Sequence, residues 1–345
     1  MAFADKGEKV KKLAIFRGAF LNAWDCMTFA ALSDYDFELF AVGSGKNVYG
    51  LTEPMSEPFQ TIRYEKITAV DWTAFDIIDA PELHLIETSY LCNIHPKVYV
   101  TVWDLGISRP TTYRPNIKSK ARHFIARSLI ARDTLVQDGV PPEKVSVIPA
   151  SVDMKQFPFH LRGEKDRTDK FVILYVGRLH ATKGIQILRK VFDGILGSFR
   201  DAELWVVGTG DVALIEPVGG AVKYFGFVPD RNKLAEIYDA ADLFVGPSLY
   251  EEQFGVVFIE AMATGLPVIT TDSGAIPWIV EGQIVVPRST SDFAGELQRQ
   301  IERVLADSDL RKRLSGAAGQ NVSRRFSQEV VARQLAEVYQ RETAG

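Results

Sequence analysis

Short apolar runs recur along this chain between stretches with helical periodicity, and this alternation constrains the fold more than any other feature of the sequence. In the first half, it indicates strands at residues 13–16, 39–42, 98–102, 123–126 and 145–148. Amphipathic stretches such as residues 128–138 separate several of these runs. Strands that alternate with helices predict a parallel sheet with helices on both faces.

The alternation stops near Phe157 and then starts again. Residues 160–170 (HLRGEKDRTDK) carry seven formal charges and one large apolar residue, so we interpret them as a linker between domains. A strand at 171–176 opens a second series, with a helix from about Lys183 and further strands at 203–207, 242–245 and 267–270. A length of 345 residues also suits two domains.

The sequence therefore predicts an α/β fold of two doubly wound, Rossmann-like domains that face a central cleft. We place the first domain at residues 1–160 and the second at residues 161–326. A C-terminal segment, 327–345, begins with a helix for which Ser327 is the expected N-cap.

Composition excludes several functional classes. A formal net charge of −4 gives no indication of a nucleic-acid partner. Cys26 and Cys92 are the only cysteines, too few for a disulfide framework or a cysteine metal site, and the five histidines are scattered. No apolar run reaches the ~18 residues that a membrane-spanning helix needs. We therefore expect a cytoplasmic protein without a metal site.

Residues 109–132 contain seven basic side chains and no acidic one. Such a stretch suits an anionic acceptor or lipid head groups, which would place the protein at the periphery of a membrane. A solvated basic face is the alternative, and the sequence leaves both open.

The most informative run is PSLYEEQFGVVFIEAMATGLP, residues 247–267. Glu252 lies just before a predicted helix that begins near Gly255, and Glu260 lies inside it. Eight helical residues span roughly 12 Å, which is comparable to the reach from a sugar across a diphosphate to a ribose. The free amides of a helix N-terminus suit a diphosphate, and a carboxylate can accept two hydrogen bonds from a diol. Glu252 then suits the sugar hydroxyls, and Glu260 suits the ribose.

A simpler reading makes Glu252 a helix cap and Glu260 a solvated residue. Against it, Glu260 has apolar neighbours on both sides in the sequence, where a carboxylate needs a partner.

A second signal is VGRLHATKG, residues 176–184, directly after the first strand of the second domain. Arg178 and Lys183 flank the turn at the carboxyl end of that strand, where two cations can neutralise a diphosphate and stabilise its charge as it leaves. Gly177 permits close approach of the backbone. The alternative is an Arg and a Lys that merely lie on the surface near a turn.

Further motifs accompany these two runs, at residues 147–149, 151–153, 207–210, 225–229, 241–248 and 265–268. In this order, the set resembles the retaining glycosyltransferases of family 4, which have the GT-B fold. The resemblance covers residues 145–340 well and residues 1–144 only loosely.

The resemblance implies transfer of a hexose-type sugar, with retention at the anomeric carbon, from a UDP- or GDP-sugar donor to a hydroxyl of a sugar, lipid-linked or small-molecule acceptor. It implies no metal and no other cofactor. It also implies that the last helix crosses back to pack on the first domain. The donor-binding residues implied are Gly18, Gly177, Arg178, Lys183, Gly208, Val228, Glu252, Phe254, Gly255, Val256 and Glu260.

Three departures from the family pattern matter. Gly18 lies in an Arg-Gly-Ala run where the family often has two glycines, and Trp103 with Asp104 stands where a histidine often follows a strand. Trp278 replaces a glutamate that often follows a Gly-x-Pro turn. We expect Asp104 to take over part of the histidine's role, so the implied catalytic residues are Arg178, Lys183, Glu252 and Asp104. Trp103 and Trp278 suit either stacking on sugar rings or filling the core.

No side chain stands out as a covalent nucleophile, so the expected chemistry is same-face attack assisted by the leaving phosphate. Two alternatives remain open. One is a non-catalytic GT-B subunit that binds a sugar nucleotide or a partner enzyme, and the other is a GT-B sugar-nucleotide epimerase.

Overall fold

The computed structural model describes residues 11–16, 28–29, 31–32, 35–41, 62–64, 66–81, 85–103, 114–163, 170–217 and 220–341. The chain divides into two compact units. Unit 1 comprises residues 1–149 and 331–345, and unit 2 comprises residues 150–330.

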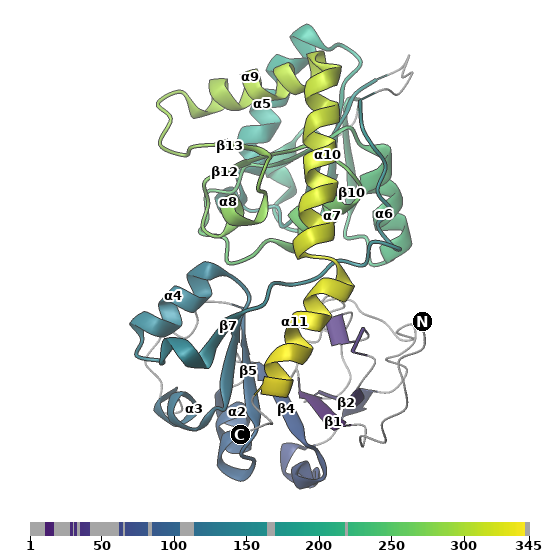
Figure 1. The fold of residues 1–345 in the computed structure, drawn as a ribbon. Coiled ribbons are helices and arrows are strands. Elements are labelled where there is room, and N and C mark those ends of the chain that lie inside the picture. The colour runs from purple at the N-terminus through teal and green to yellow at the C-terminus, as the bar shows by residue number, and fades with distance from the viewer. Residues whose placement is uncertain are drawn as a thin grey trace. The chain divides into compact units, whose positions relative to one another are not determined.

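Unit 1 is built on a parallel sheet of seven strands in the order β3-β2-β1-β4-β5-β6-β7 (Figure 1). The strands are β1 (Lys11–Phe16), β2 (Tyr35–Ala41), β3 (Ile62–Tyr64), β4 (Ile77–Pro81), β5 (Val98–Val102), β6 (His123–Ala126) and β7 (Val145–Val147). The described helices are α2 (Leu85–Ile94), α3 (Arg114–Lys120), α4 (Leu129–Gln137) and the 3-10 turns η1 (Ile67–Ala69), η2 (Trp72–Ala74) and η4 (Pro142–Lys144). Alternate residues of β1 enter separate apolar cores on the two faces: Ala14 and Phe16 on one, Leu13 and Ile15 on the other.

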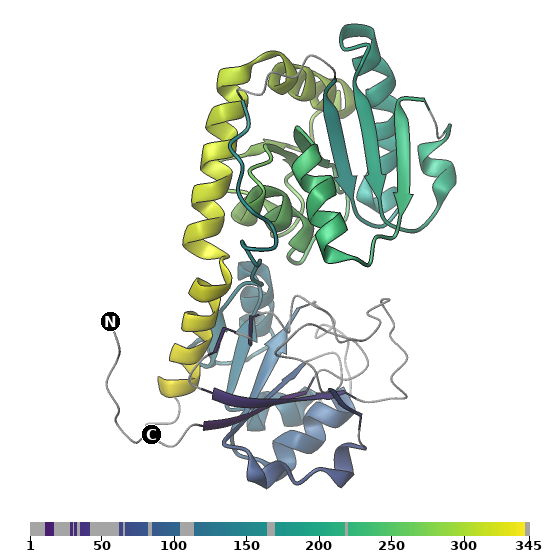
Figure 2. The same cartoon turned by 90° about the vertical axis from the view of Figure 1, so that its right-hand side faces the viewer.

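Unit 2 contains a parallel sheet of six strands in the order β10-β9-β8-β11-β12-β13, with helices on both faces (Figure 2). Its strands are β8 (Val172–Val176), β9 (Glu203–Val207), β10 (Val222–Gly226), β11 (Leu243–Gly246), β12 (Val268–Thr271) and β13 (Ile284–Val286). Its helices are α5 (Ile185–Ser198), α6 (Arg231–Ala240), α7 (Val256–Ala263), α8 (Ile276–Ile279), α9 (Phe293–Ala306) and α10 (Ser308–Arg325), with 3-10 turns η5 (Ala181–Lys183) and η6 (Val212–Ile215). The predicted two-domain α/β fold is confirmed.

The sequence reading missed β3, β4, β10 and β13. Strand β4 is central and wholly buried, yet Asp79 and Pro81 interrupt its apolar run. Strands β3 and β13 have three residues each, too short for a periodic signal. Lys223 interrupts β10 in the same way.

The boundary between the two units does not fall in the predicted linker at 160–170, and the part of it that the structure describes, residues 160–163 and 170, lies inside unit 2. Arg162 of this segment has a side chain only 2% exposed. It donates to the carbonyl and carboxylate oxygens of Asp239 at 2.7 and 2.9 Å and to the Thr264 carbonyl at 3.0 Å. Burial of a charged group requires such partners, so the charge of Arg162 docks this part of the segment on unit 2. The chain crosses between the units at 149/150, against the expected 160/161, and again at 330/331.

The last helix, α11 (Gln328–Arg341), returns the chain to unit 1. Val331, Leu335 and Tyr339 join the core that contains Leu13 and Ile15. The Tyr339 hydroxyl donates to the Asp79 carboxylate at 2.6 Å, and Thr101 donates to the other oxygen of that carboxylate at 2.8 Å. The contact fastens the helix to the middle of the sheet.

We predict that Tyr339→Phe lowers the free energy of unfolding by about 1–3 kcal/mol, because a fully buried carboxylate loses a donor. Chemical denaturation followed by circular dichroism measures this. Tyr90→Phe, at a half-buried position of α2, is the matched control and is expected to change stability by less than about 0.5 kcal/mol. Equal stability of the two variants would contradict the prediction.

Candidate functional site

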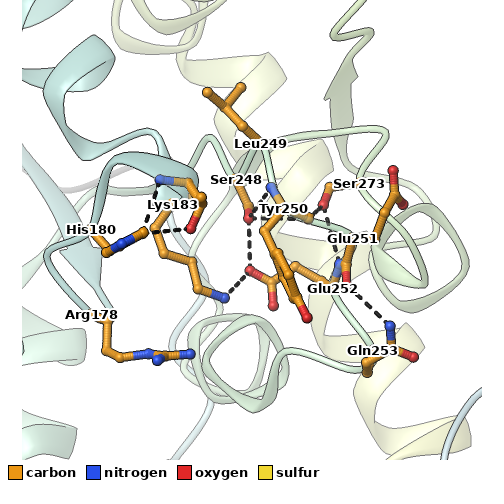
Figure 3. A network of polar contacts seen from close by, with 12 residues as sticks. Arg178, His180, Lys183, Ser248, Leu249, Tyr250, Glu251, Glu252, Gln253 and Ser273 are labelled. Atoms are coloured by element: carbon orange, nitrogen blue, oxygen red, sulfur yellow. Dashed lines mark hydrogen bonds and ion pairs between the residues drawn. The ribbon is translucent and has the colours of Figure 1, made fainter. Parts of the chain in front are cut away.

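An ion pair joins the two runs of sequence that were singled out as a donor site. The Lys183 Nζ atom lies 2.5 Å from Oε1 of Glu252, although 69 residues separate them in sequence (Figure 3). The Ser248 hydroxyl donates to the same oxygen at 2.8 Å. The Lys183 and Glu252 side chains are only 18% and 14% exposed, so each charge depends on the other for compensation.

Backbone contacts bring these side chains together. Leu249 and Tyr250 both donate their backbone N–H groups to the Thr182 carbonyl, at 2.8 and 2.9 Å. Gly184 follows with a φ of +72°, and a Cβ there would lie 1.9 Å from the carbonyl oxygen of Pro247. Only glycine fits this position, because the turn η5 presses against the loop that follows β11.

A second close approach lies at the ends of β8 and β9. Gly208 has a φ of +140°, and a Cβ there would lie 1.8 Å from the Gly177 carbonyl oxygen. The Gly208 N–H donates to the Gly226 carbonyl at 2.8 Å, which ties in the loop that contains half-buried Val228. Gly177, Gly208 and Val228 therefore belong to successive loops at the carboxyl ends of neighbouring strands, the edge where sheets of this class bind ligands.

Arg178 is exposed beside the Lys183–Glu252 pair. Figure 3 shows its guanidinium reaching in the same direction as the Lys183 ammonium. No ion pair joins Arg178 to any residue in the described part of the chain. Its charge and that of Glu252 both act on Tyr175: burial and Glu252 raise the pKa of this tyrosine, and Arg178 opposes them.

Helix α7 begins directly after this cluster. Its N-cap, Gly255, has a φ of +82°, and no side chain caps the helix. The positive end of the helix dipole there favours an anion, and the expected contact of the amides of residues 254–256 with a diphosphate stays a prediction. Phe254 is buried and packs edge-on against Phe326, with ring centroids 6.0 Å apart.

Glu260 has polar partners, as expected for a carboxylate with apolar neighbours. Arg231 Nη1 lies 2.8 Å from Oε1, and the Tyr238 hydroxyl donates to Oε2 at 3.0 Å. The Glu260 side chain is 2% exposed, so the simpler reading of it as a solvated residue is wrong. Its expected contact with a ribose stays a prediction.

Trp278 packs against unit 2's own residues. Its ring lies 6.2 Å from that of Phe326, and the Arg325 guanidinium lies 4.7 Å from the Trp278 ring and 4.8 Å from the Phe326 ring. Of its two expected roles, packing is the one that these contacts fit. Trp103 is half-buried with Arg127 5.0 Å from its ring.

Two expected site residues, Gly18 and Asp104, lie outside the described residues. Of the basic stretch 109–132, Lys118 pairs with Asp138 and Arg132 with Asp133, while Arg127 is buried. These contacts engage part of the charge that suggested a membrane or an anionic acceptor, and both roles stay predictions.

Sequence reasoning missed several residues of the site. Ser248 belongs to a motif that was noticed, but serines are too common for the motif to assign it a role. Tyr250 lies 5.3 Å from Lys183 Nζ by its ring centroid, and Ser273 donates to the Tyr250 carbonyl. Arg231 and Tyr238 lie on α6, and nothing in the sequence connects that helix with Glu260.

The part of the chain that the structure describes holds no cluster of three or more His, Cys, Asp or Glu side chains placed to bind a metal ion. Within the same residues, every helix is too short or too polar to cross a membrane.

Residues 170–307, which carry this site, match the family model described as Glycosyl transferases group 1. The chain is related to glycosyltransferases. An uncharacterized glycosyltransferase of Methanocaldococcus jannaschii is 31% identical over 219 residues, covering 58% of this chain and 54% of that protein. A D-inositol 3-phosphate glycosyltransferase of Corynebacterium kroppenstedtii is 26% identical over 330 residues, covering 88% of this chain and 71% of that protein.

A phosphatidyl-myo-inositol mannosyltransferase of Mycobacterium leprae is 32% identical over 176 residues, covering 49% of this chain and 46% of that protein. The matches to this enzyme and to the M. jannaschii protein thus span about half the length of each relative.

Solved structures confirm the fold. A sucrose-phosphate synthase from Thermosynechococcus elongatus superposes with a TM-score of 0.74 at 22% identity, over 97% of this chain and 99% of that one. The Anabaena protein HepE, in complex with UDP and glucose, gives 0.72 at 18% identity, over 96% of this chain and all of that one. The fold is GT-B, as the resemblance implied.

We predict that Gly184→Ala disrupts the contact between η5 and the loop after β11. A methyl group 1.9 Å from the Pro247 carbonyl must displace the turn, and a positive φ adds strain, so stability falls by about 1–3 kcal/mol or more. Gly197→Ala is the control, because a Cβ there meets nothing within 4 Å and the site is helical. That variant is expected to gain about 0.5–1 kcal/mol. Thermal unfolding of both proteins checks the prediction, which fails if Gly184→Ala melts like the wild type.

Proposed function

We propose that this chain is a retaining glycosyltransferase that moves a hexose-type sugar from a UDP- or GDP-sugar to a hydroxyl acceptor. The observation that carries the proposal is the Lys183–Glu252 pair, 2.5 Å apart, directly before the uncapped N-terminus of α7. A cation, a carboxylate and free backbone amides are the groups that a sugar diphosphate needs.

The proposed roles follow from charge. The departing diphosphate gains negative charge, which Arg178, Lys183 and the uncapped N-terminus of α7 stabilise. Lys183 has three N–H donors, so it can keep its bond to Glu252 and still donate to a phosphate oxygen. Glu252 accepts from the sugar hydroxyls. The acceptor hydroxyl attacks the anomeric carbon from the face that the diphosphate leaves and gives its proton to the leaving diphosphate oxygen, which preserves the anomeric configuration without a covalent intermediate on the protein.

The base would lie near the backbone of Val228, and Glu260 would accept from the ribose. In this proposal the two cations neutralise the diphosphate, so transfer needs no metal ion. EDTA is then expected to leave the rate unchanged.

The comparisons narrow the choice of substrates for testing. Two relatives are named for inositol-containing molecules, and one similar structure holds UDP and glucose. Inositol derivatives therefore belong in the first acceptor panel, with UDP-glucose and GDP-mannose among the first donors. The anomeric configuration of any product, read by NMR, tests retention.

We predict that Lys183→Ala and Glu252→Gln each lower kcat/KM for the donor by about 100-fold or more, since each removes a charged partner of the reacting centre. Lys223→Ala is the matched control, because Lys223 also pairs with a glutamate of unit 2, Glu203, but has no place in the proposed site. Its activity is expected to stay within about twofold of wild type.

Near-normal transfer by Lys183→Ala or Glu252→Gln would contradict the assigned roles. Tight nucleotide binding without turnover of any donor would favour the non-catalytic subunit. A new sugar nucleotide formed without an acceptor would favour the epimerase.

A further inference from the structure

Two glutamates stand next to each other before α7, and the structure gives each its own cation. Glu252 pairs with Lys183. Glu251 pairs with Arg288, whose Nη2 atom lies 2.7 Å from Oε1. The Glu251 side chain is 60% exposed and that of Glu252 is 14% exposed, so the neighbours differ sharply in their access to solvent.

Arg288 follows β13 and joins two segments around Glu252. Its Nη1 donates to the Leu249 carbonyl at 3.2 Å, in the loop after β11. Its Nε and its backbone N–H donate to Oδ1 of Asp272 at 3.1 and 2.8 Å, and its Nη2 donates to the Asp272 carbonyl at 3.2 Å. The rigid fork of a guanidinium suits such a set of acceptors, and a lysine could satisfy few of them.

The segment that contains Asp272 also forms hydrogen bonds with the loop that contains Glu252. Thr271 donates its hydroxyl to the Ser248 carbonyl at 2.5 Å, and Ser273 donates to the Tyr250 carbonyl. Ala275 donates its N–H to the carbonyl of Glu252 itself at 2.8 Å. Arg288 therefore adds side-chain contacts between two segments that are also joined by hydrogen bonds to the backbone on both sides of Glu252.

The titration behaviour agrees with this geometry. The hydrogen bond with Glu251, followed by that with Asp272, raises the pKa of Arg288. Partial burial acts to raise the pKa of Asp272, but the bonds from the backbone and side chain of Arg288 outweigh it and hold that pKa below its usual value.

We propose that Arg288 is a positioning residue for Glu252. Arg288 binds the Glu251 carboxylate and the Leu249 carbonyl, and these contacts fix the loop that leads to α7. Because Glu251 is paired with Arg288, Glu252 is the glutamate that pairs with Lys183. The inference rests on the proposed function, because it concerns how the donor site is kept in register. Without Arg288, Glu251 loses its counter-charge one residue from Glu252, and the loop loses its ties to Asp272.

The test compares Arg288→Gln and Arg288→Lys with Arg299→Gln. Arg299 also pairs with two carboxylates of unit 2, Glu296 and Asp292, and it lies on α9 outside the site. With the donor that the wild type turns over, Arg288→Gln is expected to lower kcat/KM by about tenfold or more, as displaced catalytic groups do. Arg288→Lys is expected to recover part of this loss through its charge, and Arg299→Gln is expected to match wild type. Wild-type activity of Arg288→Gln overturns the proposal.

A double-mutant cycle separates positioning from a general loss of stability. If Arg288 acts through Glu252, adding Arg288→Gln to Glu252→Gln lowers kcat/KM by less than about twofold further. Fully additive losses overturn the proposal.

The proposed function can fail independently, and then the wild type turns over no donor. Crystal structures of Arg288→Gln and Arg299→Gln still decide the role of Arg288. A Lys183–Glu252 pair within hydrogen-bond distance in both variants overturns it, and a pair lost only in Arg288→Gln supports it.

Discussion

The ion pair between Lys183 and Glu252 is the interaction on which the rest of the site depends. Neither side chain is more than one-fifth exposed, so each has lost much of its hydration. Removing one partner of such a pair leaves a poorly solvated charge, which costs more than the pair itself contributes. The pair is therefore a weak source of stability but a strong constraint on geometry. It fixes a cation and a carboxylate at one point beside the end of α7.

Three glycines allow the close backbone contacts that bring the loops of this site together. Gly184 brings η5 against Pro247, and Gly208 brings the loop after β9 against Gly177. Gly274 completes the set with a φ of +53°, because a Cβ there would lie 2.2 Å from the carbonyl of Glu252. Each is a position where any side chain would meet backbone, so the cost cannot be relieved by a change of rotamer. Close contacts between backbone segments thus set the geometry of the site, and the charged side chains are positioned by those segments.

The sequence predicted the alternating fold and the two runs that form the site, because periodicity and helix-start signals are local. It placed Glu252 ahead of a helix and Lys183 where a turn leads into a helix, and both positions are correct, since η5 ends at Lys183 and α5 begins at Ile185. What it missed depends on contacts between distant segments. Arg162 looked like part of a charged linker because its acceptors, Asp239 and Thr264, lie 77 and 102 residues further along.

Glu260 is a second case in which a contact between distant segments could not be predicted from the sequence. Its apolar neighbours required a partner, but sequence spacing could not name one on α6. The structure supplies Arg231 and Tyr238, and burial together with the charge of Glu260 raises the pKa of that tyrosine well above its usual value. This shift favours the protonated tyrosine, the form that donates to Glu260. The Arg231 side chain is 22% exposed and that of Glu260 is 2% exposed, so the partner on α6 carries the solvent contact of this pair.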